Sequence, residues 1–113
     1  MKNNKVTAKS YSLLTEKGNW LGQVVLTSDG MFAAVTDWGN FSFAWRSIGD
    51  KSIEDFILGT DVHYFSGKMH QGMSFVAYGK KIEVAAQRFS EEILPVLKLA
   101  ILKEREESAD AES

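Results

Sequence analysis

The chain has 113 residues, about one domain, and its 44% hydrophobic and 25% charged content is typical of a folded protein and not of a disordered one. It contains no cysteine, which excludes a disulfide framework, a thiolate metal site and a cysteine nucleophile. The formal net charge of -2 lacks the basic excess with which duplex-binding domains contact phosphates.

The two ends of the chain carry opposite charge. The basic start, residues 1–5, is followed by no apolar run, so we expect no signal peptide. No apolar stretch is long enough to span a bilayer, and we expect a cytoplasmic protein without a membrane partner. Residues 103–113 carry five acidic and two basic side chains. We therefore predict a single α+β domain over 1–106 and an acidic C-terminal tail over 107–113.

Alternating apolar and polar residues predict an antiparallel β-meander in the first half of the chain. The first segment has mixed polarity and is expected at the sheet edge. Asp29-Gly30 fits a two-residue hairpin loop with positive φ at both central positions. Residues 38–40 form the corner before the last strand. The predicted strands cover residues 6–14, 20–27, 31–37 and 41–46.

After Gly49 the spacing of the apolar residues changes from that of a strand to that of a helix. The hydroxyl of Ser52, followed closely by acidic residues, is typical of a helix start. We therefore predict a short helix that begins there and ends at Gly59. Asp61 caps a second short helix, which stops at Gly72.

The strongest helical pattern runs from residue 80 to residue 106. Pro95 interrupts it and predicts a kink or break near Leu94, because an interior proline removes one hydrogen bond and clashes with the preceding turn. Ser90 is a candidate cap if the break comes earlier. The apolar segment 73–78 before this helix is either a strand or a connector.

These elements predict an α+β fold, an antiparallel meander of three to four strands packed against two short helices and a long, Pro-kinked C-terminal helix. Apolar periodicity places much of the core in ten side chains, namely Trp20, Val24, Leu26, Phe41, Phe43, Trp45, Phe56, Phe89, Ile93 and Leu97.

Three aromatic residues, Phe41, Phe43 and Trp45, share one face of the last strand and have two interpretations. Aromatics two apart on a strand stack on bases in single-stranded nucleic-acid binders. The basic residue that normally flanks such a motif is absent before Gly39, where Trp38 stands instead. Core packing is therefore favoured, and nucleic-acid binding is the alternative function.

No motif predicts catalysis or a cofactor. His63 and His70 lie seven residues apart, about two helical turns, without a clear third ligand, so no metal is expected. The chain has no Gly-x-Ser-x-Gly elbow and no phosphate-binding glycine loop. We expect a protein that is not an enzyme and needs no cofactor.

The last helix has an apolar stripe wide enough to cover a sheet, with Leu94, Leu99 and Leu102 on its flanks. Closing the protein's own core is the favoured interpretation, and a surface for a second copy or another protein is the alternative, with a homodimer through this helix as one form. The candidate partner-binding residues are Trp38, Arg46, His63, Leu99 and Leu102.

The run 37–45, with 47–49, 55–58 and 64–69, resembles small uncharacterised proteins of tailed bacteriophages and prophages, over roughly a third of the chain. The resemblance rests on the motif Trp-Gly-Asn-Phe-x-Phe-x-Trp followed by short helices, and the combined spacing of aromatics, glycines and helix is more specific than any single element. It implies an accessory phage protein in the bacterial cytoplasm that binds a host or phage protein in a host-virus interaction such as host takeover or defence evasion.

Overall fold

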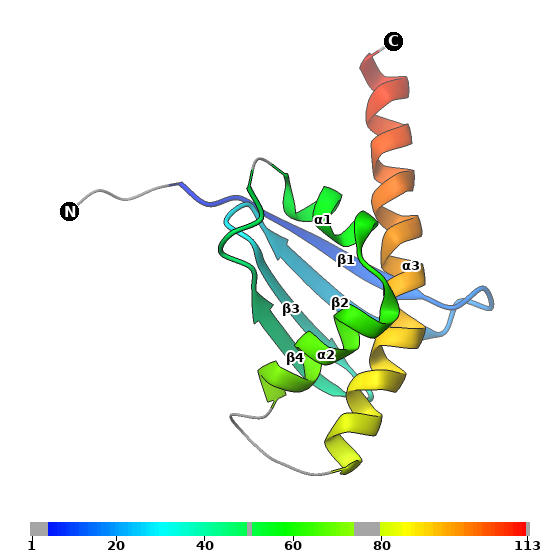
Figure 1. The fold of residues 1–113 in the computed structure, drawn as a ribbon. Helices are drawn as coiled ribbons and strands as arrows, with labels where there is room; N and C mark the ends of the chain where they lie inside the picture. The colour runs from blue at the N-terminus through cyan, green and yellow to red at the C-terminus, as the bar shows by residue number, and fades with distance from the viewer. Residues whose placement is uncertain (1–4, 50, 74–79, 113) are drawn as a thin grey trace.

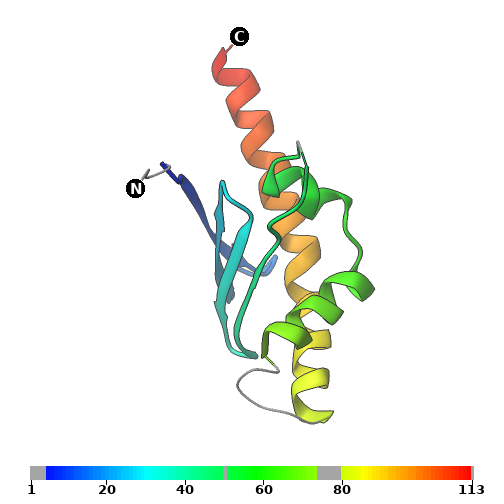
Figure 2. The same ribbon diagram turned by 60° about the vertical axis from the view of Figure 1, so that its left-hand side comes forward.

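One antiparallel sheet and three helices form the fold, seen in a computed structural model that describes residues 5–49, 51–73 and 80–112. The sheet has the order β1-β2-β3-β4, with β1 at Ala8–Leu14, β2 at Trp20–Thr27, β3 at Met31–Thr36 and β4 at Gly39–Ala44. The helices are α1 at Ile53–Gly59, α2 at Val62–Met73 and α3 at Lys80–Glu112. All three lie on one face of the sheet (Figures 1 and 2), which confirms the predicted α+β class.

The strand register divides the sheet side chains into an inner face toward the helices and an outer face away from them. One inner row across the four strands is Tyr11, Val24, Ala34 and Phe41. These four side chains are buried, as the alternating pattern requires. The predicted first strand is also confirmed, and it lies at the sheet edge.

The hairpin between β2 and β3 differs from the predicted two-residue loop. Gly30 has φ +94°, whereas no residue other than glycine has positive φ in the described ranges. The Gly30 N–H donates to the Thr27 carbonyl at 3.1 Å, so the turn closes over Thr27 to Gly30 and only its last residue is left-handed. At the next corner, Gly39 and Asn40 already belong to β4.

Both predicted helix caps are confirmed. The Ser52 hydroxyl accepts a hydrogen bond from the Asp55 N–H at 3.1 Å, and the Asp61 carboxylate accepts one from the Tyr64 N–H at 2.8 Å. The first helix ends at Gly59 as predicted, and α2 ends one residue beyond Gly72. The predicted strand or connector at 73–78 lies, apart from Met73, outside the described residues.

Of the kink or break predicted near Leu94, the break does not occur, because α3 continues through Pro95 to Glu112 as one helix. Pro95 is exposed, so water can hydrate the carbonyl that loses its partner, while buried residues hold the helix on both sides of it. Ser90 is no cap, since its hydroxyl donates to the Ala86 carbonyl at 2.7 Å within the helix. The predicted tail continues the helix to Glu112.

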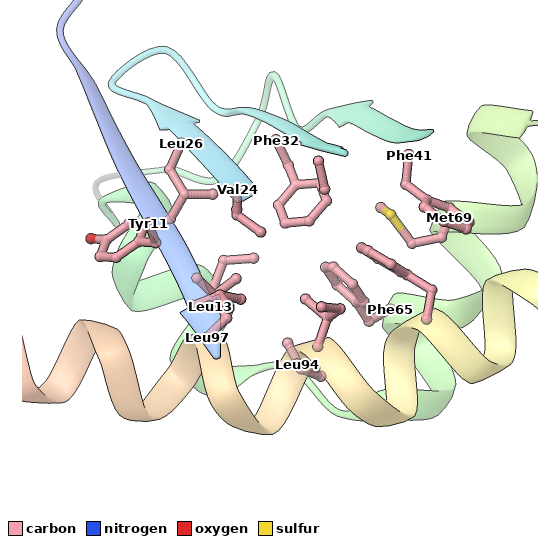
Figure 3. Packing of buried hydrophobic residues seen from close by; sticks show 14 of the residues in the cluster. Tyr11, Leu13, Val24, Leu26, Phe32, Phe41, Phe65, Met69, Leu94 and Leu97 are labelled. Carbon is pink, nitrogen blue, oxygen red and sulfur yellow. The ribbon is translucent and has the colours of Figure 1, made fainter. Parts of the chain in front are cut away.

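The core lies between the sheet and the helices. Figure 3 shows Phe32 from β3, Phe65 from α2 and Leu94 from α3 pointing into it. Phe43 and Phe56 are half-buried and pack against this core. The predicted core residues that are buried are Val24, Leu26, Phe41, Trp45, Phe89, Ile93 and Leu97.

Trp20 is not a core residue, since its side chain is 44% exposed. The reason is a register shift between β1 and β2, where Leu13 pairs with Gly22 but Leu14 pairs with Trp20. Leu21 is the extra residue at this irregularity, and it is buried in place of Trp20. A strict two-residue alternation counted from Val24 back to Trp20 therefore places Trp20 on the wrong face of the sheet.

Candidate functional site

The outer face of the sheet carries no charged side chain. Its residues alternate with the buried inner row on each strand, and no described helix covers it (Figure 2). Alanine, serine, threonine, valine, methionine and amide side chains make up most of the face, and the exposed side chains of Leu14 and Trp20 lie at one end of it. The outer-face residues are Ala8, Ser10, Ser12, Leu14, Trp20, Gln23, Val25, Thr27, Met31, Ala33, Val35, Asn40, Ser42 and Ala44.

The centre of this outer face is apolar and open to solvent. Val35 is 56% exposed and Met31 is 46% exposed. Polar groups surround them, and among these the Gln23 amide donates to the Ser10 hydroxyl at 2.9 Å. An apolar centre with a neutral polar rim is the composition of a protein contact surface.

A cavity of about 820 Å³ opens over one part of the outer face. Val25, Val35 and Asn40 line it from the sheet, and Gly72 and Ile82 line it from the helical layer. Its volume is within the usual range for ligand pockets. None of the described residues that line it is charged.

The end of α2 comes very close to the edge strand β4. A Cβ added to Gly72 would lie 2.2 Å from the Ser42 carbonyl oxygen, so only glycine permits this approach. By contrast, a Cβ on Gly67 of the same helix would meet nothing within 4 Å. Gly72 thus sets the position of α2 at the wall of the cavity.

The ion pairs of the described residues lie on the helical side of the sheet. Lys9 contacts Glu104 at 2.7 Å and Glu54 at 3.7 Å, which joins β1 to α3 and α1. Arg105 contacts Asp55 at 2.6 Å and lowers the pKa of that carboxyl by hydrogen bonding. These pairs fasten the helices to one another and to β1, and they leave the outer face neutral.

Tyr11 makes the protein less stable at alkaline pH. Its hydroxyl is buried without a hydrogen-bond partner in the described part of the chain, and burial, with the negative charge of Glu104 nearby, raises the pKa of Tyr11 to about 12. The folded state therefore holds this proton more tightly than the unfolded state. Its stabilising effect is complete below pH 10 and is lost as pH rises toward 12.

We expect the free energy of unfolding to fall by about 1–2 kcal/mol between pH 10 and pH 12, less than the full value for two pKa units because nearby water screens the charge. Tyr11→Phe should be as stable as the parent or more stable at pH 8, since it removes an unpaired buried hydroxyl. Urea unfolding of both proteins across this pH range measures the difference. Parallel pH curves for the two would show that Tyr11 does not carry the dependence.

The five candidate partner-binding residues do not form one surface. Trp38 is half-buried at the turn between β3 and β4, and Arg46 is exposed beyond the opposite end of β4. His63 is exposed on α2. Only Leu99 and Leu102 lie together, 67% and 51% exposed on α3.

His63 and His70 line a groove between α2 and α3 together with Glu83. Within the described ranges, no three histidine or acidic side chains are grouped so that they could hold a metal ion. The groove therefore gives no support to a metal centre at the histidine pair.

The aromatic residues of β4 and its end point toward the helices, as the core interpretation predicts. Phe41 is 2% exposed and Trp45 is 7% exposed. Phe43 is half-buried, and the Lys68 amine lies 5.4 Å from the centre of its ring. Phe41 and Trp45 are therefore not exposed as the stacking platform that the nucleic-acid alternative assigned to this motif.

The uncharged sheet face and the single helical layer define a small two-layer α+β protein. None of its described helices is long and apolar enough to cross a membrane. A family model described as a phage family, Phage_phiTE_072, matches residues 1–111, and the chain belongs to this family. This confirms the resemblance to phage proteins. No curated protein and no solved structure matches the chain.

Proposed function

We propose that this phage-family protein is a non-enzymatic binding protein that docks an uncharged, apolar segment of a host or phage protein on the outer face of its sheet. The observation that carries the proposal is this neutral face, with exposed Val35 and Met31 on its interior strand β3 and the cavity of about 820 Å³ that Val35 lines. An exposed apolar surface of this kind is typical of protein contact sites.

The chemistry of the outer face selects the partner. A charged side chain buried against it would lose its water and find no opposite charge, which is costly. Serine, glutamine and asparagine at the rim can still pair with the backbone of a docked segment, because each carries a donor and an acceptor. A neutral, predominantly apolar segment meets both conditions.

The same chemistry argues against nucleic acid as the occupant. Lysine and arginine neutralise the phosphates and supply most of the affinity of nucleic-acid binding, and the outer face carries neither. Membership in a phage family supports action in the bacterial cytoplasm, where an accessory protein meets its host or phage partner.

The test compares two single variants in capture from lysate of phage-infected bacteria. Val35→Arg places a cation at the centre of the outer face, and Leu99→Asp changes an exposed residue in the other layer. We expect one stoichiometric protein to bind the parent and Leu99→Asp, and to be lost with Val35→Arg. A synthetic peptide of its uncharged segment should bind the purified parent at least tenfold more tightly than it binds Val35→Arg.

Three results would contradict the proposal. The first is a partner that Val35→Arg retains, and the second is recovery of no stoichiometric partner across several hosts. The third is quenching of tryptophan fluorescence by single-stranded oligonucleotides at micromolar protein and moderate salt, which would support the nucleic-acid alternative instead.

A further inference from the structure

The solvent-facing side of α3 carries a stripe whose charge changes along its length. Positions three or four residues apart lie on one side of a helix. The side opposite the core carries two basic residues toward its start with Val84 between them, then Glu92, an apolar middle from Pro95 to Leu102, and Glu106 at its end. This α3 stripe consists of Lys81, Val84, Arg88, Glu92, Pro95, Leu99, Leu102 and Glu106, all exposed.

The buried side of α3 is complete without this stripe. Phe89, Ile93 and Leu97 are fully buried against the sheet and α2. Leu99 and Leu102, at 67% and 51% exposure, contribute nothing to closing the core. Two exposed leucines beside an exposed proline on an otherwise charged helix face indicate a contact with something outside the chain.

We infer that the α3 stripe binds the same stripe of a second copy in antiparallel orientation. With the two-fold axis near the level of Leu97, Arg88 of each copy lies opposite Glu106 of the other. Pro95 then lies opposite Leu99, and Glu92 lies opposite Leu102, so the apolar contact is centred on Pro95 and Leu99. A parallel pairing would set Arg88 against Arg88 and Glu106 against Glu106, so charge complementarity selects the antiparallel form.

The size of the stripe sets the strength of this dimer. In this register residues 88–106 of the two stripes overlap, a length of about 27 Å at 1.5 Å per residue. One helix width of contact over that length is about 300 Å² per copy, well below the area of a standard stable interface. The dimer is therefore weak, and it forms on the layer opposite the outer face of the sheet.

Sedimentation velocity of the full chain from about 1 to 200 μM tests the inference. The parent should change from monomer to dimer over this range, and Leu99→Asp should weaken the dimer at least tenfold. Arg88→Glu and Glu106→Arg should each weaken it, and the double variant should restore it because the two pairs are rebuilt in reverse. Val35→Arg is the matched control and should dimerise as the parent does.

These variants change exposed residues, so their melting temperatures should stay close to that of the parent. A parent that remains monomeric at 200 μM would overturn the dimer. A double variant without recovery would overturn the antiparallel pairing. Loss of the dimer in Val35→Arg with retention in Leu99→Asp would assign the contact to the outer face of the sheet instead.

Discussion

Phe89→Ala is expected to lower the free energy of unfolding by about 3–5 kcal/mol, a large part of the stability of a small domain. Phe89 is fully buried, and its ring stacks on Phe41 with 4.0 Å between ring centres. It also lies 6.1 Å from the Phe65 ring. The substitution leaves a cavity where α3, β4 and α2 pack together. Urea unfolding at neutral pH measures the loss.

Leu102→Ala is the control for this prediction, because Leu102 lies on the same helix with 51% of its side chain exposed. Measured at low micromolar concentration, its effect should stay within about 0.5 kcal/mol. Equal losses for Phe89→Ala and Leu102→Ala would mean that Phe89 is not the centre of the core.

Gly30→Ala is expected to cost about 2–4 kcal/mol. Gly30 has φ +94°, and the left-handed conformation costs about 1–2 kcal/mol for a residue with a Cβ. That Cβ would lie 2.2 Å from the Trp45 carbonyl oxygen, so the chain after β4 must move. In the parent, the Trp45 N–H donates to the Gly30 carbonyl at 2.8 Å. The movement of the chain in the variant would distort this hydrogen bond as well. Thermal unfolding of the variant gives the size of the loss.

Gly18→Ala separates the two contributions. Gly18 has φ +88°, but a Cβ there would meet nothing within 4 Å. It should therefore cost only the conformational part, about 1 kcal/mol. If the two variants lose the same stability, the contact with Trp45 contributes nothing.

Local signals in the sequence predict most of the fold. The caps at Ser52 and Asp61 are confirmed. Each capping side chain accepts a hydrogen bond from the backbone N–H three residues later, so the signal is contained in a short stretch of sequence. The four strands are confirmed because alternation reflects the two faces of a sheet.

Long-range contacts decide the features that the sequence does not predict. Trp20 is exposed because β1 shifts register against β2, which only the paired strands reveal. The helix continues through Pro95 because buried residues on both sides hold it against the sheet.

The candidate site is less predictable than the fold. The neutral residues of the outer face are visible in the sequence, but they come from four strands and become one surface only through the register. Exposed Leu99 and Leu102 were predictable, because helical periodicity places them away from the core. No periodic pattern relates Arg46 to His63, and the structure sets them on separate elements.

The link between the first strand and the last helix has a consequence for synthesis of the protein. Lys9 reaches Glu104, and Leu13 shares one core with Ile101, so residues from both ends of the chain complete the same interior. Contacts this distant in sequence form late, after the ribosome has released the last helix. A product that stops before α3 leaves the inner side of the sheet uncovered, and we expect host proteases to remove it rapidly. Only full-length chains would then accumulate in the cell.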